Sequence, residues 1–170
     1  MFRRTTAERP RRLAIPRSRR LVIDLLRLNQ QVPTTAHDRI TDLTILTTAR
    51  DCAAQRISWS VLFIKAFAIV AAKYPPLRQV YMPWPWPHLY QHPHSLATIV
   101  THREVCGEPW LFWSRFLRPE EISLDRLQTH LDRCQTLPVQ EIFQRQWWLS
   151  GLPSWIRRIA WWWTLNVSGV

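Results

Sequence analysis

The chain has 170 residues, of which 46% are hydrophobic, and a formal net charge of +11. This length allows one domain with a hydrophobic core, and the apolar fraction excludes a chain that is disordered throughout. The three glycines, Gly107, Gly151 and Gly169, do not form a phosphate-binding loop, a dinucleotide fingerprint or a nucleophile elbow. The composition therefore speaks against NTP hydrolysis, hydride transfer and lipase-type catalysis.

The positive charge is concentrated near the N-terminus. Nine of the 23 Lys and Arg residues precede Leu28, and residues 1–17 form an arginine-rich stretch interrupted by Pro10 and Pro16. The stretch lacks the apolar segment of a secretory signal, so we interpret it as a solvated, disordered leader and expect a cytoplasmic protein. An organelle transit peptide and an arm that contacts nucleic-acid phosphates are alternatives, and we favour neither.

The first elements expected after the leader are a helix and a strand. Ser18 is a candidate cap for a helix over 18–29, because leucines repeat on one face at helical spacing. β-branched residues in near alternation over 39–48 predict a strand that runs into a short helical turn at 49–55.

Residues 58–74 form the most apolar segment of the chain. They are apolar nearly all round and end at Pro75-Pro76, which predicts a buried helix. The segment is too short for a transmembrane helix and carries Lys65 near its centre, which argues against a bilayer span.

The remainder of the chain predicts strands followed by helices. Strands of one sheet are expected at 77–82, 89–92, 95–103 and 110–116. Gly107-Glu108 indicates a hairpin turn, whereas the proline-rich link over 82–87 cannot be a central strand. Helices are expected from Pro119, over 139–149, and from Pro153 to about Thr164.

The histidines and cysteines supply no supported catalytic or metal site. His92 and His94 have a usable spacing for two ligands on a strand, but no third ligand is evident, so ordinary loop histidines are preferred. His37 is followed by Asp38 and is a candidate general base, but neighbours in sequence need not be in contact, so we favour an ordinary polar turn. The three cysteines are far apart and are expected to be reduced thiols. We therefore predict no catalytic residue and no metal, and leave cofactor-binding residues open.

The C-terminal segment over 147–170 is rich in tryptophan and arginine. As an amphipathic helix it would turn Trp155, Ile156, Ile159, Trp162 and Trp163 to a hydrophobic surface, with Arg157 and Arg158 on the other side. Such a helix suits peripheral contact with a membrane through Trp155, Trp161, Trp162 and Trp163. The same residues suit a lid over a tunnel within the protein, and the pattern does not decide between the two.

A family resemblance is carried by the segment Ile57–Leu77, ISWSVLFIKAFAIVAAKYPPL. This segment, which ends in Lys-Tyr-Pro-Pro-Leu, resembles the apolar Ile-Lys-Ala…Ala-Leu-Lys…Pro-Glu-Leu-Asn helix of the 2-oxo acid dehydrogenase acyltransferases, the chloramphenicol acetyltransferase-like family. His94–Ile99 is similar to the strand that enters the family's acyl-binding region, and the resemblance covers about Arg19 to Gln140. Arg78 stands where the family has Asn, which is a departure from its pattern.

The resemblance implies an α+β fold in which helices cover a mixed β-sheet. It divides the chain into the leader at 1–17, a partial acyltransferase-like domain at 18–146 and the Trp/Arg-rich segment at 147–170. It also implies a homotrimer and transfer of an acyl group from a CoA or carrier thioester, which would be a substrate rather than a bound cofactor.

The family's catalytic motif is not found in this sequence. The motif is His-x-x-x-Asp-Gly, with the histidine as general base, together with a Ser or Thr that stabilises the oxyanion. None of the six histidines has Asp four residues later. We expect the chain to stop before that region and to be inactive alone. The alternative is a non-enzymatic protein that binds a membrane surface or nucleic acid through the leader and the Trp-rich end.

Overall fold

The computed structural model describes residues 14–30, 32 and 34–168. Most of the predicted leader lies outside the described residues. The elements, in chain order, are α1 (Arg17–Asn29), α2 (Thr44–Asp51), α3 (Trp59–Lys73), η1 (Pro75–Arg78), β1 (Gln79–Met82), β2 (His88–Gln91), β3 (Leu96–Val105), β4 (Glu108–Leu117), α4 (Leu124–Thr136), α5 (Val139–Ile142), α6 (Gln144–Gly151), α7 (Ser154–Trp163) and η2 (Thr164–Ser168).

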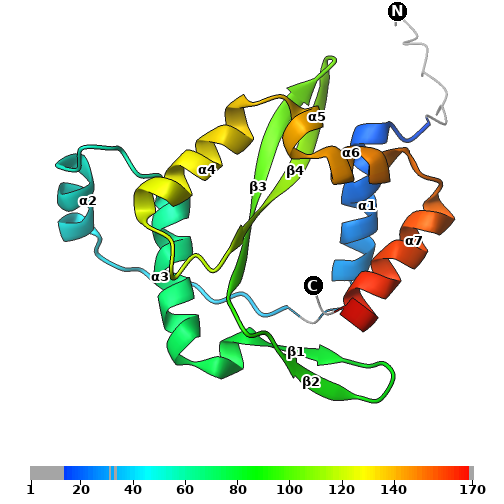
Figure 1. Ribbon diagram of the computed structural model, residues 1–170, viewed down its shortest axis with the longest axis horizontal. Coiled ribbons are helices and arrows are strands. Elements are labelled where there is room, and N and C mark those ends of the chain that lie inside the picture. The colour runs from blue at the N-terminus through cyan, green and yellow to red at the C-terminus, as the bar shows by residue number, and fades with distance from the viewer. Residues whose placement is uncertain (1–13, 31, 33, 169–170) are drawn as a thin grey trace, which may run out of the picture.

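The long β3–β4 hairpin lies at the centre of the molecule (Figure 1). In the view of Figure 1, α3 and α4 lie to the left of it, and α1, α6 and α7 lie to the right, beside β4, where Gln146 of α6 is hydrogen-bonded to the backbone of Trp113. The short β1–β2 hairpin extends from one end, next to the C-terminal end of α3. The α+β class is confirmed. Within the described residues, however, the strands form two separate antiparallel pairs and not one mixed sheet.

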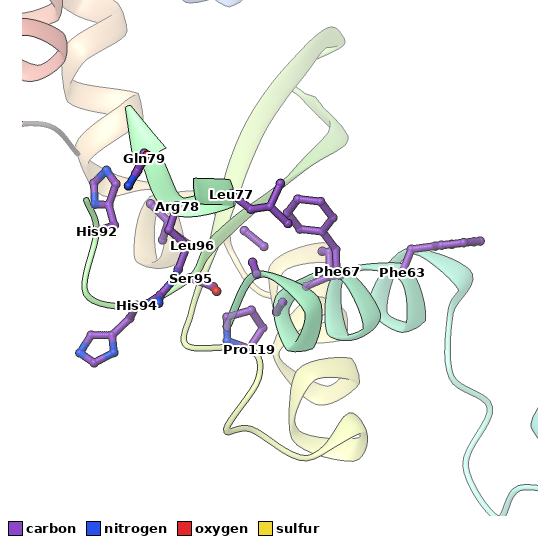
Figure 2. Close-up of a pocket in the computed structure, with 14 residues that line it drawn as sticks. Phe63, Phe67, Leu77, Arg78, Gln79, His92, His94, Ser95, Leu96 and Pro119 are labelled. Carbon is purple, nitrogen blue, oxygen red and sulfur yellow. The ribbon is translucent and has the colours of Figure 1, made fainter. Parts of the chain in front are cut away.

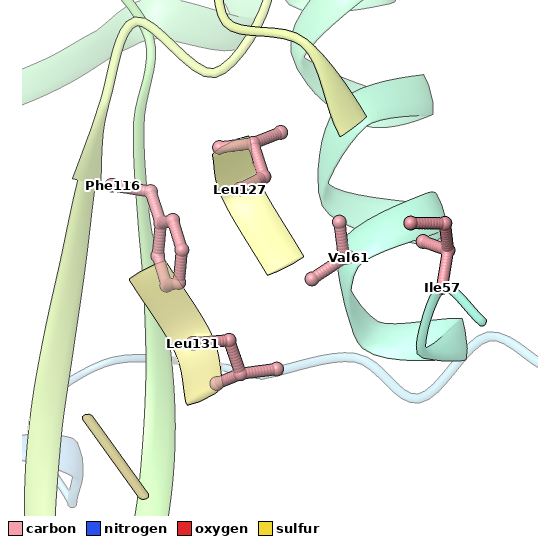
Figure 3. Packing of buried hydrophobic residues seen from close by; sticks show 5 residues of the cluster. All are labelled: Ile57, Val61, Phe116, Leu127 and Leu131. Atoms are coloured by element: carbon pink, nitrogen blue, oxygen red, sulfur yellow. The ribbon is translucent and has the colours of Figure 1, made fainter. Parts of the chain in front are cut away.

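Two clusters of buried side chains form the core on one face of the β3–β4 hairpin. The first joins α3, β4 and α4 through Ile57, Val61, Phe116, Leu127 and Leu131 (Figure 3). The second joins β4 to α4, α5 and the residue after α5 through Trp110, Phe112, Cys134, Val139 and Phe143. Alternate residues of β4 are buried, which is the pattern of a strand with only one covered face.

The turn of the central hairpin is one residue earlier than expected. Val105 pairs with Glu108, so the two-residue loop is Cys106-Gly107 and not Gly107-Glu108. Both loop residues have positive φ, 52° at Cys106 and 76° at Gly107, as the twist of a tight hairpin requires.

The strand predicted over 39–48 is wrong, because α2 occupies Thr44–Asp51. Threonine hydroxyls in this segment donate to backbone carbonyl oxygens one helical turn earlier. Thr47 Oγ1 donates to Leu43 O at 2.9 Å, and Thr48 Oγ1 donates to Thr44 O at 3.0 Å. Asp42 accepts from both the backbone N–H and the hydroxyl of Thr44. β-branched residues favour strands mainly through packing on neighbouring strands, and among the described residues no strand pairs with this segment.

The other predicted helices are present, with changes at their ends. The first begins at Arg17, so Ser18 lies inside α1 and is not its cap. The helix predicted from Pro119 begins only at Leu124, after a turn whose Arg118 has a φ of 52°. The helix predicted over 139–149 is divided into α5 and α6 at Phe143.

Helix α3 is confirmed, but its predicted burial is wrong. Ser58 caps it by accepting a hydrogen bond from the N–H of Val61. Only Val61, Ala68 and Ala71 of this helix are buried, and large apolar side chains including Phe63 and Phe67 are exposed. Among the described residues, no helix is both long enough and apolar enough to cross a bilayer.

The C-terminal helices are joined to α1 by polar contacts. Arg157 of α7 donates from Nε to Asp24 Oδ2 at 2.6 Å, and both side chains are only 6% exposed. Arg17 donates to Ser150 Oγ and Trp147 O, and its guanidinium lies over the Trp147 ring. Arg157, which was expected on the polar outer side of α7, therefore faces α1.

Candidate functional site

A groove of about 600 Å³ lies between α3, η1 and the segment that joins β2 to β3 (Figure 2). This volume is within the range of about 300–1,000 Å³ that is typical of small-molecule sites. Its lining falls into an apolar part and a polar end. The apolar part consists of Phe63, Ile64, Phe67, Ala68, Ala71, Leu77, Leu96, Ala97 and Pro119. The polar end consists of Arg78, Gln79, His92, His94 and Ser95.

The apolar wall follows from the spacing of residues in α3. Ile64, Ala68 and Ala71 are four and three residues apart, so they share one face of the helix. The two alanines are buried and small, which leaves space beside β3 that larger side chains would fill. Phe63 and Phe67 are one turn apart and border this space from the outer side of the helix (Figure 2).

The polar end contains side-chain atoms that lack hydrogen-bond partners. Ser95 is 7% exposed, and its hydroxyl has no partner among the described residues. The Nε of Arg78 is buried and unpartnered within the same part of the chain, although Nη1 of Arg78 donates to Pro93 O. Glu120 accepts weakly from the backbone N–H of Ser95 through Oε1 at 3.4 Å, while its other oxygen is unpartnered. Buried polar atoms of this kind call for a partner such as water or a ligand.

Lys65 supports the floor of the groove from inside the molecule. Its ammonium group donates to three backbone carbonyl oxygens, of Pro119 at 3.1 Å and of Glu120 and Ile122 at 2.7 Å each. These contacts hold the turn before α4 against α3, and Pro119 of that turn lines the groove. They also give a physical reason for the late start of α4, since a helix from Pro119 would use some of these carbonyls within itself.

The structure brings two of the singled-out histidines into the groove and leaves the others outside it. His92 and His94 lie in the segment between β2 and β3 and not on a strand, and their rings point away from each other (Figure 2). Within the described ranges, no group of three His, Cys, Asp or Glu residues could hold a metal ion. His37 and Asp38 are exposed in a segment without regular structure, and no hydrogen bond joins them.

The cysteines do not contribute to the groove. Cys52, Cys106 and Cys134 are free thiols, and only Cys134 is buried. Its Sγ lies 3.8 Å from Nε2 of His130, one turn earlier in α4. This pair faces a different cavity, beside Trp113 and Gln144.

Sequence reasoning missed Ser95 and the use of Arg78 as a groove residue. Arg78 was noted only as a departure from a family pattern. The two residues meet because β1 and β2 form a hairpin, whose end is fixed by the hydrogen bond from the His92 N–H to Arg78 O at 2.9 Å. The sequence signal for this contact was the pair of predicted strands on either side of the proline-rich link over 82–87. Two such strands predict a hairpin but not its register.

Comparisons of the chain with protein-family models, with curated proteins and with solved structures give no significant match. We therefore infer the chemistry of the site from the residues of the groove alone. In the described structure, no hydrogen bond links the Ser95 hydroxyl to either groove imidazole, so the groove shows no activated nucleophile. The arrangement suits binding of an apolar chain that carries a hydrogen-bonding oxygen at one end.

Proposed function

We propose that this protein is an acyltransferase-like protein whose α3 groove binds an acyl chain without transferring it. The observation that carries the proposal is an apolar groove that ends at two unpartnered buried donors, the Ser95 hydroxyl and Arg78 Nε. The acyl chain would lie along Ile64, Ala68 and Ala71, and its carbonyl or carboxylate oxygen would accept from the two donors.

The energies of the two parts of the groove support this orientation. Burying a methylene group contributes about 0.8 kcal/mol, so the apolar wall favours longer chains. Leaving a buried donor without a partner costs about 1–3 kcal/mol, and a ligand oxygen at Ser95 would remove that cost. A ligand without such an oxygen would gain the free energy of burying its apolar surface, but it would leave both donors without a hydrogen-bond partner.

The broader acyltransferase-like interpretation includes the chloramphenicol acetyltransferase-like fold, a homotrimer and a cytoplasmic location. The order of a capped apolar helix, strands and a further helix supports the fold, although the mixed sheet of that fold is not formed within the described residues. The exposed apolar side chains of α3, Phe63, Phe67 and Val70 among them, support a covering subunit because such surfaces are usually covered. Acyl transfer itself is not expected, because no histidine in the groove is paired with a carboxylate.

Calorimetry with straight-chain fatty acids and their CoA thioesters, from four to twelve carbons, tests the binding. We expect affinity to rise by up to about fourfold per added methylene, until the groove is full. Ser95→Ala should weaken binding of the acid by about five- to tenfold, from the loss of one hydrogen bond. Thr98→Ala is the matched control, since Thr98 lies on β3 three residues after Ser95, is exposed and does not line the groove.

Affinity that does not change with chain length, or equal losses in Ser95→Ala and Thr98→Ala, would contradict the proposal. Transfer from acetyl-CoA and from longer acyl-CoA to thiol and amine acceptors is measured in parallel. We expect no turnover above the buffer blank. Turnover that disappears in His37→Ala or His92→Ala would show that a base is present and that the protein is an enzyme.

A further inference from the structure

The outer face of α7 exposes four large apolar side chains. Trp155, Ile159, Trp162 and Trp163 are each between 47% and 64% exposed. Their spacing of four, three and one residues places them on one side of the helix. The face differs from the one expected, because Ile156 and Trp161 are half-buried, Trp161 with its Nε1 enclosed, whereas Ile159 is exposed as expected.

A basic groove lies beside this face, between α1 and the start of α7. It has a volume of about 520 Å³, and its lining includes four arginines, Arg20, Arg27, Arg157 and Arg158. Among the described residues, Asp24 is the one acidic residue that lines it, and it is paired with Arg157. Arg20, Arg27 and Arg158 make no ion pair within the described residues, so the groove keeps a positive charge.

Arg158 connects the groove and the apolar face. It lines the groove, and it follows Trp155 by three residues, so it lies at the border of the exposed tryptophans on the same helix. Tryptophan is enriched at the boundary between membrane and water, where its ring is apolar and its N–H remains near the headgroups. Arginine near this boundary is attracted to anionic lipid.

We propose that this side of the protein docks on an anionic membrane surface. The α7 tryptophans enter the headgroup region, and the groove arginines contact lipid phosphates. The charge of the groove favours this occupant over a second copy of the chain, whose own α7 face would bring the same positive charge. The proposal is independent of acyl binding, because none of its residues lines the α3 groove.

Co-sedimentation of the full chain with vesicles tests the docking. Vesicles of phosphatidylcholine alone and of phosphatidylcholine with 30% phosphatidylglycerol are compared at low and high salt. We expect binding to the anionic vesicles that weakens with salt, and little binding to the neutral ones. Arg158→Gln should lower the partition coefficient about fivefold, and Trp155→Ala should lower it at both salt concentrations.

Matched controls test whether vesicle binding depends on this surface or only on the total charge and tryptophan content of the protein. Arg126→Gln removes one exposed arginine from α4, and Trp148→Ala removes one exposed tryptophan from α6. Both should bind as the unaltered protein does. Circular dichroism checks that each variant is folded, and Arg158→Gln keeps the test decisive if Trp155→Ala does not fold, because Arg158 is exposed.

Three results would overturn the proposal. The first is equal binding to neutral and anionic vesicles. The second is an equal loss in Arg158→Gln and Arg126→Gln, which would show attraction by net charge alone. The third is no vesicle binding, accompanied by self-association in sedimentation velocity, by tight binding of inorganic phosphate, or by binding of nucleic acid.

Discussion

The ion pair between Arg157 and Asp24 gives a quantitative test of how α7 is attached to α1. The guanidinium donates to both carboxylate oxygens, at 2.6 Å from Nε and 3.4 Å from Nη2, and both side chains are 6% exposed. Asp24→Ala leaves the buried guanidinium with one hydrogen bond, from Nη1 to Leu152 O. Removing one partner of a buried pair costs about 3–5 kcal/mol, and we expect a loss of this size.

Urea denaturation followed by tryptophan fluorescence measures the loss. With a denaturant dependence of about 1–3 kcal/mol per molar for a small protein, the midpoint should fall by about 1–5 M. Glu121→Gln is the control, because it breaks the ion pair of Glu121 with Arg118 at 3.7 Å, whose side chains are 58% and 45% exposed. An exposed pair contributes about 0–1 kcal/mol, so that variant should change the midpoint little.

The double variant Asp24→Leu with Arg157→Met distinguishes an unpaired charge from lost packing. Replacing both partners by apolar side chains leaves no buried charge, so the double variant should be more stable than Asp24→Ala. Equal midpoint shifts in Asp24→Ala and Glu121→Gln would refute the reasoning. So would a double variant that is as unstable as the single one.

Three further predictions concern polar contacts elsewhere in the fold. Lys65→Met keeps the apolar stem but leaves the carbonyls of the turn before α4 without their donor, so thermal denaturation should show a loss of about 1–3 kcal/mol. Arg17→Met removes two hydrogen bonds and the stacking on Trp147 and should cost about 1–3 kcal/mol in the urea assay, while a value near zero would show that the α1–α6 contact does not depend on it. The hydroxyl of Thr44, followed by its backbone N–H, lowers the pKa of Asp42. The Asp42 carboxylate therefore stabilises α2 above the usual aspartate pKa, and this stabilisation is lost as the pH falls through the lowered pKa. NMR signals of α2 should report the loss below the usual aspartate pKa, and Asp42→Asn should abolish the pH dependence.

Local signals in the sequence predicted the helices well. The leucine spacing of α1 and the apolar segment of α3, which ends before Pro75-Pro76, are each set by residues within a few turns. Signals of this kind need no knowledge of distant parts of the chain.

The errors arose where distant residues decide the structure. The segment at 39–48 has the composition of a strand, but pairing with another strand is a long-range property, and threonine hydroxyls stabilise a helix there instead. The start of α4 depends on Lys65, more than fifty residues earlier. The polar end of the α3 groove depends on the β1–β2 register, which brings Arg78 close to the segment containing Ser95.

The exposure of α3 shows why an apolar helix is not always a core helix. Its buried face is made largely of small residues, Ala68 and Ala71, so a close approach to β3 leaves the larger Phe63 and Phe67 outside. That surface resembles the exposed face of α7 in composition but not in charge. The α3 groove ends at a single arginine with partly enclosed donors, which suits one ligand oxygen. Helix α7 instead borders a groove with three arginines that make no ion pair within the described residues, which suits an extended array of anions. The charge around each apolar surface, more than its hydrophobicity, therefore separates the two ligand classes that we propose.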